Sequence, residues 1–446
     1  MRRIELQPTE PFRASFINRT GAFNADALIT ATKIVDDVRK GGDDELRALT
    51  EKFDGVKVKD FRVPDEAIDR AFDEANPDTI EALRHAAAQI REFHERQVQQ
   101  SWFFAREDGA IVGAKVTPID SVGIYVPGGR ALYPSSVLMN AIPASVAGVG
   151  RIVCATPPSK DGSVDAAILV ACKLGGVHDV YTVGGAQAIA ALAYSTDSIP
   201  AVDKITGPGN AFVAAAKKVV SGDVGIDMIA GPSEVCVVAD ETAEPSLVAI
   251  DLMAQAEHDP LAACYLVCES NDYADKVEAA IAEHLKHSPR ADITKASLDS
   301  QGLIVIVNDM EQAIQTVNVI APEHLEMHVK DAMEYVGAIR NAGAIFLGPW
   351  TPEAVGDYVA GPNHTLPTGG TARFASPLSV DEFVKKSSII QYSSKALQND
   401  SKSIMQIALH EGLWAHAQSV ALRMHAMEAG DDAGKVEGSD KERIDG

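Results

Sequence analysis

The sequence predicts an α/β fold with two doubly wound, incomplete Rossmann-like domains, an N-terminal helical arm and a helical C-terminal tail. Short apolar runs alternate with helix-patterned segments, once from Ser121 and again from Ser233. Glycine-rich loops follow several of these runs. Strand, loop and helix repeated in this order are typical of mostly parallel sheets, whose ligands lie over the carboxyl ends of the strands. The length of 446 residues also exceeds what one hydrophobic core usually serves.

The composition is that of an ordinary globular protein, with 46% hydrophobic and 23% charged residues. The formal net charge is -23, and no run of lysine and arginine interrupts it. Binding to a polyanion needs such clustered positive charge, so we expect no nucleic acid as a partner.

The sequence predicts neither secretion nor a membrane anchor. The first residues, MRRIELQPTEPF, lack the apolar segment of a secretory signal. No segment approaches the roughly 20 continuous apolar residues of a transmembrane helix. The five cysteines show no CxxC spacing and lie mostly in apolar runs: Cys154, Cys172, Cys236, Cys264 and Cys268. We expect them to be buried hydrophobic residues in a reducing cytoplasm.

Ahead of the first alternating series, residues 1–24 are predicted to form an arm, and the sequence is helix-patterned from Ala25 to Arg39. Beyond Pro77, apolar residues recur every three or four positions and predict an amphipathic helix to about Gln100. Residues 101–119 then alternate around Asp108-Gly109, which predicts a hairpin.

Residues 121–232 are predicted to form an inserted domain that binds a dinucleotide, with helices over 135–149, 164–174, 186–194 and 211–220. Its loops VPGGR (126–130), GGAQA (184–188) and TGPGNA (206–211) each follow a strand and precede a helix. Bare backbone N–H groups at a helix start bind anions. Any one of these loops could be only a tight turn, and none matches GxGxxG. The presence of three at one end of one sheet slightly favours a dinucleotide.

Residues 25–120 and 233–378 are predicted to share the core of the other α/β domain, which carries the metal and catalytic residues. Its expected strands are EVCVVAD, AACYLVCES, LIVIVND and GAIFLG, and its expected helices include 273–285 and one from Glu311. Residues 379–426 are predicted to be a helical tail that docks elsewhere, because they lack strand material for a core of their own. Residues 427–446 are charged and glycine-rich, which predicts disorder.

The stretch MAQAEHDP closes a predicted helix with Gln255 and His258 three residues apart on one face. An imidazole and an amide oxygen so placed make half of a metal site. A histidine near a helix end is more often a surface residue stabilised by the helix dipole, so this spacing alone does not decide between the two.

In IAPEHLE, Pro322 fits the first turn of a helix and would place Glu323 and His324 at its amino end. The helix dipole there would keep His324 neutral and able to accept a proton. A general acid/base pair and a capped surface helix are equally consistent with this run. Further polar residues occupy junctions marked by glycine or proline, with no spacing rule that links them: Ser233, Asp357, His364, Glu411 and His416.

Taken together, the motifs GIYVPGG, GGAQAIAAL, KITGPGN, AGPSE, QAEHDP, APEHLE, GPNHTLPTGGTARFASPLSVDEF and EGLWAHAQSV resemble the histidinol dehydrogenase family, in that family's order. The resemblance extends roughly from Arg13 to Met424. It implies oxidation of L-histidinol through the aldehyde to L-histidine, with two NAD+ and one Zn2+ per subunit. The set is highly specific, whereas no single motif would be.

The resemblance also implies the role of each site residue. The zinc ligands would be Gln255, His258, Asp357 and His416, which would also contact the substrate together with Ser233, His324, His364 and Glu411. Glu323 would activate the water that hydrates the aldehyde, and His324 would take protons from the alcohol and then from the hydrate. The NAD contacts would be Tyr125, Gln187 and Asn210.

In that family the C-terminal tail is exchanged in a homodimer, so Glu411, His416 and His364 would complete the partner's site. A sibling dehydrogenase acting on a small sulfonated diol is the nearest alternative, and the Glu323-His324 pair argues for histidinol. A zinc hydrolase or a non-enzymatic acidic interaction protein are more distant alternatives.

Overall fold

The computed structural model describes residues 1–17, 19, 25–128, 132–229 and 231–428. Among these residues the chain divides into two compact units, Met1–Val98 with Pro118–Val384, and Gln99–Thr117 with the described part of Lys385–Gly446. Part of the predicted arm (18 and 20–24), the end of the VPGGR loop and the acidic extension from 429 lie outside the described residues. None of the described helices is both long and apolar enough to cross a membrane.

The alternation from Ser121 forms a parallel sheet, as predicted, in the order β6-β5-β4-β7-β8. Its strands are β4 (Ser121–Tyr125), β5 (Arg151–Thr156), β6 (Asp179–Thr182), β7 (Lys204–Thr206) and β8 (Gly225–Ile226). Its helices are α4 (Pro134–Ala147), α5 (Ala166–Gly175), α6 (Gly185–Tyr194) and α7 (Ala211–Val220), close to the predicted spans. The neighbours β4 and β7 mark where the strand order reverses, the usual position of a ligand in such sheets.

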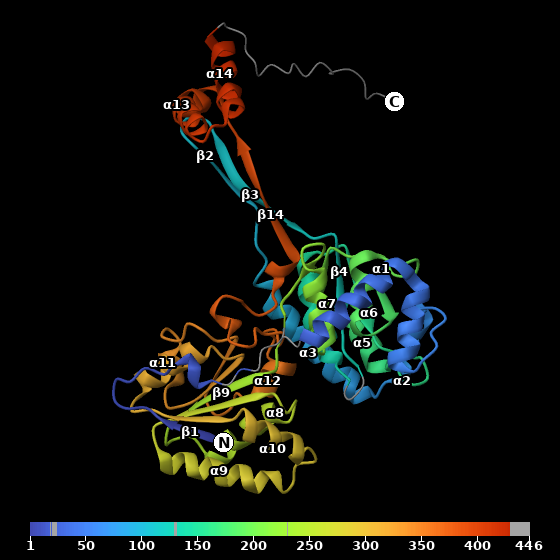
Figure 1. Ribbon diagram of the computed structural model, residues 1–446, viewed down its shortest axis with the longest axis vertical. Coiled ribbons are helices and arrows are strands. Elements are labelled where there is room, and N and C mark those ends of the chain that lie inside the picture. Colours follow the sequence, from blue (N-terminus) through green and yellow to red (C-terminus); the bar gives the residue numbers. More distant parts are fainter. Residues whose placement is uncertain (18, 20–24, 129–131, 230, 429–446) are drawn as a thin grey trace. The chain divides into compact units, whose positions relative to one another are not determined.

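Helices α1 (Ala25–Asp54), α2 (Asp65–Glu74) and α3 (Pro77–Glu95) cover this same sheet (Figure 1). The apolar face of α1 joins the core of α6 and α7, while α2 and α3 join the core of α4 and α5. We expected this region to share a core with the later strands, and that expectation is wrong. Apolar periodicity shows that a helix has a buried face but does not identify the sheet that buries it.

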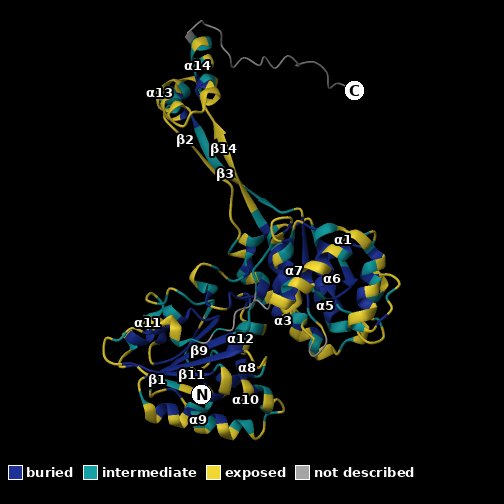
Figure 2. Ribbon diagram, viewed as in Figure 1, coloured by how far each residue is buried: buried dark blue, intermediate teal, exposed yellow. Residues whose placement is uncertain are grey.

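The second series forms another parallel sheet, in the order β1-β11-β10-β9-β12-β13, with strands that are largely buried (Figure 2). Its strands are β1 (Arg2–Glu5), β9 (Glu234–Ala239), β10 (Ala263–Cys268), β11 (Leu303–Ile306), β12 (His324–His328) and β13 (Ala344–Leu347). The helices α8 (Pro245–Ala256), α9 (Asn271–Leu285) and α10 (Ala291–Ser300) pack on one face, and α11 (Met310–Ile320) packs on the other. The short α12 (Glu353–Tyr358) follows β13.

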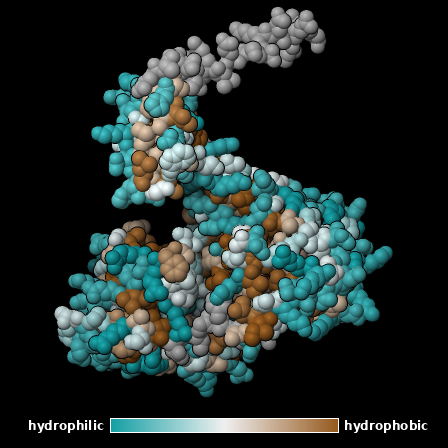
Figure 3. Space-filling model, turned by 45° about the horizontal axis from the view of Figure 1, so that its top comes forward, coloured by the Kyte–Doolittle hydropathy of each residue, from teal (hydrophilic) through white to brown (hydrophobic). Residues whose placement is uncertain are grey.

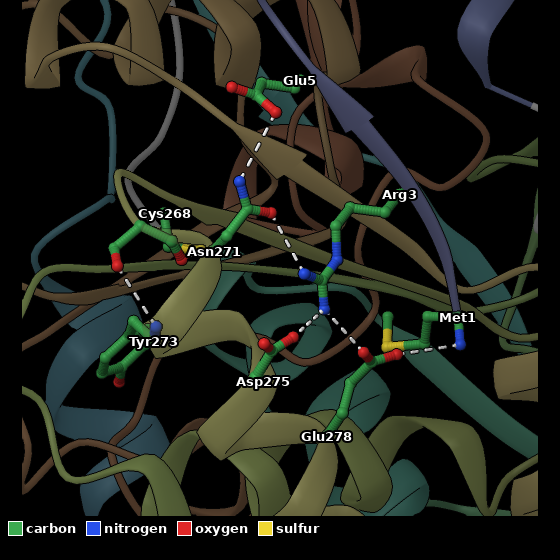
Figure 4. A network of polar contacts seen from close by, with 9 residues as sticks. Met1, Arg3, Glu5, Cys268, Asn271, Tyr273, Asp275 and Glu278 are labelled. Atoms are coloured by element: carbon green, nitrogen blue, oxygen red, sulfur yellow. Dashed lines mark hydrogen bonds and ion pairs between the residues drawn. The ribbon is translucent and has the colours of Figure 1, made fainter.

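The first residues are a strand, not the helical arm that we expected. β1 pairs in parallel with β11 at the edge of the sheet. The side chain of Arg3 binds Asn271, Asp275 and Glu278 on α9, and the amino terminus also pairs with Glu278 (Figure 4). These polar contacts hold the start of the chain against the sheet.

The predicted helix at IAPEHLE is also wrong. The helix α11 ends at Ile320, Ala321 caps it with φ 48°, and the chain then enters β12. β12 pairs with β9 on one side and β13 on the other, so the backbone of His324 lies in the middle of the sheet. Proline is common both in a first helical turn and just after a helix end, so Pro322 could not distinguish the two.

The second unit contains the predicted hairpin, β2 (Trp102–Ala105) paired antiparallel with β3 (Ile111–Pro118). The strand β14 (Val384–Gln391) extends this sheet beside β3, and the helices α13 (Ser394–His410) and α14 (Trp414–Glu428) follow. We expected helices only after residue 379, so β14 corrects that prediction, and residues 99–117 belong with the tail. β14 is exposed along most of its length and therefore lacks the apolar signal of a core strand.

Candidate active site

The candidate site lies at the amino ends of β9 and β12, beside the carboxyl end of α8. Glu234 begins β9, and the neighbouring β12 begins with His324, which pairs in register with Val235. Glu323 directly precedes β12. The sequence motifs AGPSE, QAEHDP and APEHLE therefore meet in space because two neighbouring parallel strands start at the same edge.

The imidazole of His324 is buried, with only 4% of its surface exposed. Its Nδ1 lies 3.2 Å from the backbone oxygen of Glu234, which can only accept, so Nδ1 carries the hydrogen. Nε2 then holds a bare lone pair and has no hydrogen-bond partner among the described residues. Burial lowers the pKa of His324 to about 3, and the neighbouring His258 and His364 lower it further. The expected neutral histidine is present, but burial and not a helix dipole makes it neutral.

Glu323 is buried beside the same ring, with its Oε2 3.8 Å from Nδ1 of His324. That oxygen accepts a 2.9 Å hydrogen bond from the backbone N–H of Glu234. Burial raises the pKa of Glu323 well above the ordinary value, and the charges of Glu234 and Asp357 raise it further. A carboxylate in this environment is a stronger base than an exposed one.

Helix α12 adds two carboxyl groups to the site. Oδ1 of Asp357 lies 3.9 Å from Nε2 of His324, and Oε1 of Glu353 lies 3.9 Å from Nδ1. Burial raises the pKa of Asp357 to about 6. The sequence had predicted Asp357 but missed Glu353. The signal was available, because residues four apart share one face of a helix.

Gln255 lies in the last turn of α8, and His258 lies in the turn just after the helix, which ends at Ala256. The predicted common helical face is therefore wrong for His258, although its charge still acts on His324. Gln255 is 1% exposed, and its amide nitrogen, in the orientation that satisfies both groups, lies 2.5 and 2.8 Å from the carboxylate oxygens of Glu353. His258 follows one turn later and keeps solvent access, although partial burial lowers its pKa.

The substrate residues predicted in this unit are also near the site. Nδ1 of His364 donates to the backbone oxygen of Asp357 at 3.0 Å, and Nε2 lies 3.4 Å from Oγ of Ser136 on α4. We expected His364 to complete the partner's site, but these contacts place it beside Asp357 of its own chain. Burial lowers the pKa of His364 to about 4. Ser233 directly precedes Glu234 at the start of β9. A cavity of about 570 Å³ lies beside Glu234. The carboxylate of Glu234 also forms a bidentate ion pair with Arg19.

The atoms around Asp357 fit a metal ion. His324, Glu353 and Asp357 can each offer one ligand atom within 4.8 Å of the others, and the amide of Gln255 lies against Glu353. Imidazole nitrogen and carboxyl or amide oxygen are donors that suit zinc with an open coordination position. The unpartnered Nε2 of His324 leaves a polar atom aimed into this space.

Glu411 and His416, predicted from the resemblance, belong to the second unit. Glu411 caps the end of α13, and His416 lies in the first turn of α14, both with exposed side chains. Their part in the site stays a prediction.

The predicted cofactor residues stand at the carboxyl edge of the first sheet. Tyr125 ends β4, and its hydroxyl accepts the backbone N–H of Gly185 at 3.0 Å. Gln187 lies buried in the first turn of α6. Asn210 caps α7 by accepting the N–H groups of Phe212 and Val213. Two helix starts therefore flank the point where the strand order reverses, a typical place for a phosphate-containing ligand.

Comparison with known proteins gives consistent matches over most of the chain. A family model described as histidinol dehydrogenase matches residues 18–424. The chain is 53% identical to the histidinol dehydrogenase of Bacillus subtilis strain 168 over 394 residues, which cover 88% of this chain and 92% of that protein. It is 50% identical to the histidinol dehydrogenase of Methanothermobacter thermautotrophicus over 399 residues, 90% and 94% of the two chains. The crystal structure of histidinol dehydrogenase from Elizabethkingia anophelis matches with a TM-score of 0.91 at 35% identity, covering 96% of this chain and 99% of that one.

Proposed function

The chain belongs to the histidinol dehydrogenase family, and we propose that it oxidises L-histidinol through L-histidinaldehyde to L-histidine, in histidine biosynthesis, with two NAD+ and one zinc ion per subunit. The observation that carries the proposal is the bare Nε2 of buried His324, with the carboxyl group of Glu323 beside the same ring. This pair offers two separate proton acceptors, which a two-stage oxidation with a hydration step requires.

In the first oxidation, Nε2 of His324 takes the hydroxyl proton of histidinol. The carbinol carbon loses a hydride, with its electron pair, for which NAD+ would be the acceptor when bound, and the aldehyde forms. Nδ1 stays bonded to the backbone oxygen of Glu234, which holds the ring in the orientation that keeps Nε2 toward the substrate. His324 then passes its proton to solvent before the second stage.

In the second oxidation, Glu323 takes a proton from water as the water oxygen bonds to the aldehyde carbon. Glu323 then releases its proton to solvent and the former carbonyl oxygen takes one up, so the product is a hydrate, which retains the carbon-bound hydrogen needed for a second hydride transfer. His324 takes a hydroxyl proton from this hydrate as the carbon loses the hydride, for which a second NAD+ would be the acceptor when bound. The remaining group is the carboxylic acid of histidine. The hydrogen bond from the Glu234 N–H keeps the Glu323 carboxyl group in place during this step.

The zinc ligands are proposed to be Gln255, His258, Asp357 and His416. When bound, the ion would supply the positive charge that holds the nitrogen atoms of the substrate. Ser233, His364 and Glu411 would position the rest of the substrate. His364 supports this arrangement because its hydrogen bond to the backbone of Asp357 couples a substrate residue to a ligand residue.

NAD+ is proposed to bind at the carboxyl edge of the first sheet, in contact with Tyr125, Gln187 and Asn210. The N-termini of α6 and α7 meet this edge and favour the negative charge of a pyrophosphate. When bound, NAD+ would supply the hydride acceptor.

The working form is proposed to be a cytoplasmic homodimer in which Glu411 and His416 complete the partner's site. All five cysteines are free and buried, which suits a reducing compartment. The second unit exposes apolar side chains that a partner chain could cover: Trp102, Phe103, Phe104, Ile390, Ile407, Leu409, Leu413, Trp414 and Leu422. Figure 3 shows apolar residues of this unit at its surface. Surfaces of this kind mark association sites in folded proteins.

The stoichiometry of NADH tests this function. Purified protein given limiting L-histidinol and excess NAD+ should form two NADH and one L-histidine per substrate consumed. A sulfonated diol serves as the alternative substrate, and an ester without NAD+ tests for a hydrolase. One NADH per histidinol, or faster turnover of either comparison substrate, would contradict the proposal.

A further inference from the structure

We propose that Glu353 is a positioning residue that fixes the amide of Gln255 with its oxygen toward the metal ion. The inference rests on the proposed function, because it assumes that Gln255 is a zinc ligand. It concerns a residue that neither the sequence motifs nor the expected ligand set includes.

A glutamine ligand can bind a metal ion in only one of its two amide orientations, whereas either oxygen of a carboxylate ligand can bind. The amide ends in an oxygen and a nitrogen of similar size, and only the oxygen can bind a cation. A free glutamine side chain could present either end to the site. A neighbour that binds only one end is therefore needed to select the productive orientation.

Glu353 provides this selection. The end of the Gln255 amide that faces Glu353 lies 2.5 and 2.8 Å from the two carboxylate oxygens, and only the assignment of that end as the nitrogen satisfies both groups. The carbonyl oxygen of a carboxyl group only accepts hydrogen bonds, and with a zinc ion bound nearby, whose positive charge would favour the ionised form, both oxygens only accept. Glu353 then binds the nitrogen end and repels the oxygen end. Both side chains are almost fully buried, so water does not compete for these groups. The amide oxygen is left facing away from Glu353, free to bind the ion.

The position of Glu353 is itself fixed from β12. Its backbone N–H, at the first residue of α12, donates a 2.9 Å hydrogen bond to Oε1 of Glu326. The first N–H groups of a helix have no partner within the helix, so this side chain caps α12. The other oxygen of Glu326 lies 3.2 Å from Nε2 of His328, and the same nitrogen lies 3.2 Å from Oδ2 of Asp251.

These contacts close a ring between three elements. Asp251 and Gln255 lie four residues apart on one face of α8. Asp251 is the first member of the ring of contacts and Gln255 is the last. The ring passes through His328 and Glu326 on β12 and through Glu353 on α12. Asp357 stands one helical turn after Glu353, so the ring also fixes the second proposed ligand relative to the first.

A swap of the two side chains tests this orienting role. The variant Glu353→Gln offers Gln255 an amide that can bind either end, and its zinc affinity should fall about 10- to 100-fold, as for other groups that orient a metal ligand. The double variant Q255E/E353Q restores a carboxylate facing an amide, now with the carboxylate toward the ion. It should regain most of the lost affinity.

Zinc affinity is measured directly, by competition of the apoprotein with a chromophoric chelator for Zn2+, without any use of activity. The matched control is Glu334→Gln, the same chemical change at an exposed position of the same unit, which should bind zinc as the unchanged protein does. Equal affinity of Glu353→Gln and the unchanged protein would overturn the proposal, as would the absence of recovery in the double variant.

Three further outcomes are decisive. If Glu353→Gln does not fold, Glu353→Asp keeps the carboxylate but shortens its reach, and unchanged zinc affinity in that variant contradicts the proposal. If the unchanged protein binds no zinc but forms two NADH per histidinol, the positioning role fails while the oxidation stands. If zinc binds and the swap behaves as expected but histidinol is not oxidised, the proposed function fails alone.

Discussion

At the scale of single residues, burial shifts the pKa values of Glu323 and His324 in opposite directions. Burial disfavours the charged form of each group, so it raises the pKa of the carboxyl group and lowers that of the imidazole. Backbone groups of Glu234 then bind one atom of each side chain, its N–H binding Glu323 and its oxygen binding His324. These two backbone contacts fix the direction of both side chains, which we propose as the two proton acceptors.

The variant Glu323→Gln tests whether Glu323 and His324 accept protons in different steps. The amide cannot take a proton from water, so aldehyde oxidation should slow by about 100-fold or more, whereas alcohol oxidation, which uses His324, should slow much less. NADH formation is followed in single turnovers started from histidinol and from histidinaldehyde. Equal slowing of both reactions would refute the separate roles.

His328 gives a prediction about stability and pH. Burial alone would lower its pKa, but hydrogen bonds and charge from Asp251 and Glu326 outweigh burial and raise the pKa to about 9. The further carboxyl group near this cluster is that of Glu353. Because the folded-state pKa lies above the unfolded value of 6.5, the stabilisation is complete below about pH 6.5 and is lost as the pH rises through about 9.

The stabilisation that protonated His328 contributes is on the order of 3 kcal/mol. The thermal midpoint of the unchanged protein should therefore exceed that of His328→Gln most at pH 6, and the difference should shrink between pH 7 and pH 10. A difference that is constant over this range would show that the histidine does not titrate there.

At the scale of elements, the backbone pairing between β12 and β13 fixes the position of Glu323. The N–H groups of Gly343 and Ala344 donate to the backbone oxygens of Pro322 and Glu323, both at 2.9 Å. A Cβ atom on Gly343 would stand 2.5 Å from the backbone oxygen of Glu323. Backbone atoms so close cannot yield without moving the strand, so glycine is required by close approach and not by its dihedral freedom.

The variant Gly343→Ala should displace Glu323 and lower kcat about 10-fold or more, because small errors in the position of a reacting group are costly. The matched control is Gly337→Ala, since a Cβ atom there meets nothing within 4 Å. Steady-state kinetics with histidinol, together with circular dichroism to confirm folding, measures the effect. Similar kcat values for the two variants would contradict this account of the β12–β13 junction.

At the scale of the whole molecule, the second unit has little core of its own. Its buried apolar side chains among the described residues are small, namely Ala110, Ala396, Ala408, Ala417 and Val420. Its large aromatic and aliphatic residues are exposed instead. A unit with this distribution gains stability by covering those side chains, which a symmetric dimer with exchanged tails would do.

Mixed subunits test whether active sites are shared. His416→Asn and Gln255→Ala should each be inactive alone. A heterodimer purified through two different tags should regain about half of the activity, because one of its two sites combines intact halves. The control pairs Gln255→Ala with Asp357→Ala, which both damage the same unit and should show no recovery. Absence of recovery in the first heterodimer would exclude exchanged tails.

The sequence by itself determined the features that depend on local pattern. Alternating apolar runs predicted the parallel strands and most helix spans, the Asp108-Gly109 turn predicted the hairpin, and the ordered motifs predicted the family. Each of these follows from periods of two or 3.6 residues or from turn chemistry, which neighbouring residues fix.

Only the tertiary structure decided the features that depend on distant partners. APEHLE became a strand because β9 and β13 pair with it on both sides, although its local signals suited a helix. β14 formed beside β3 without an apolar signal, and α1 packed on a sheet that its own periodicity could not identify. The neutral His324 and the contact of Glu353 with Gln255 arise from burial and from side chains about 70 to 100 residues apart, which no local pattern encodes.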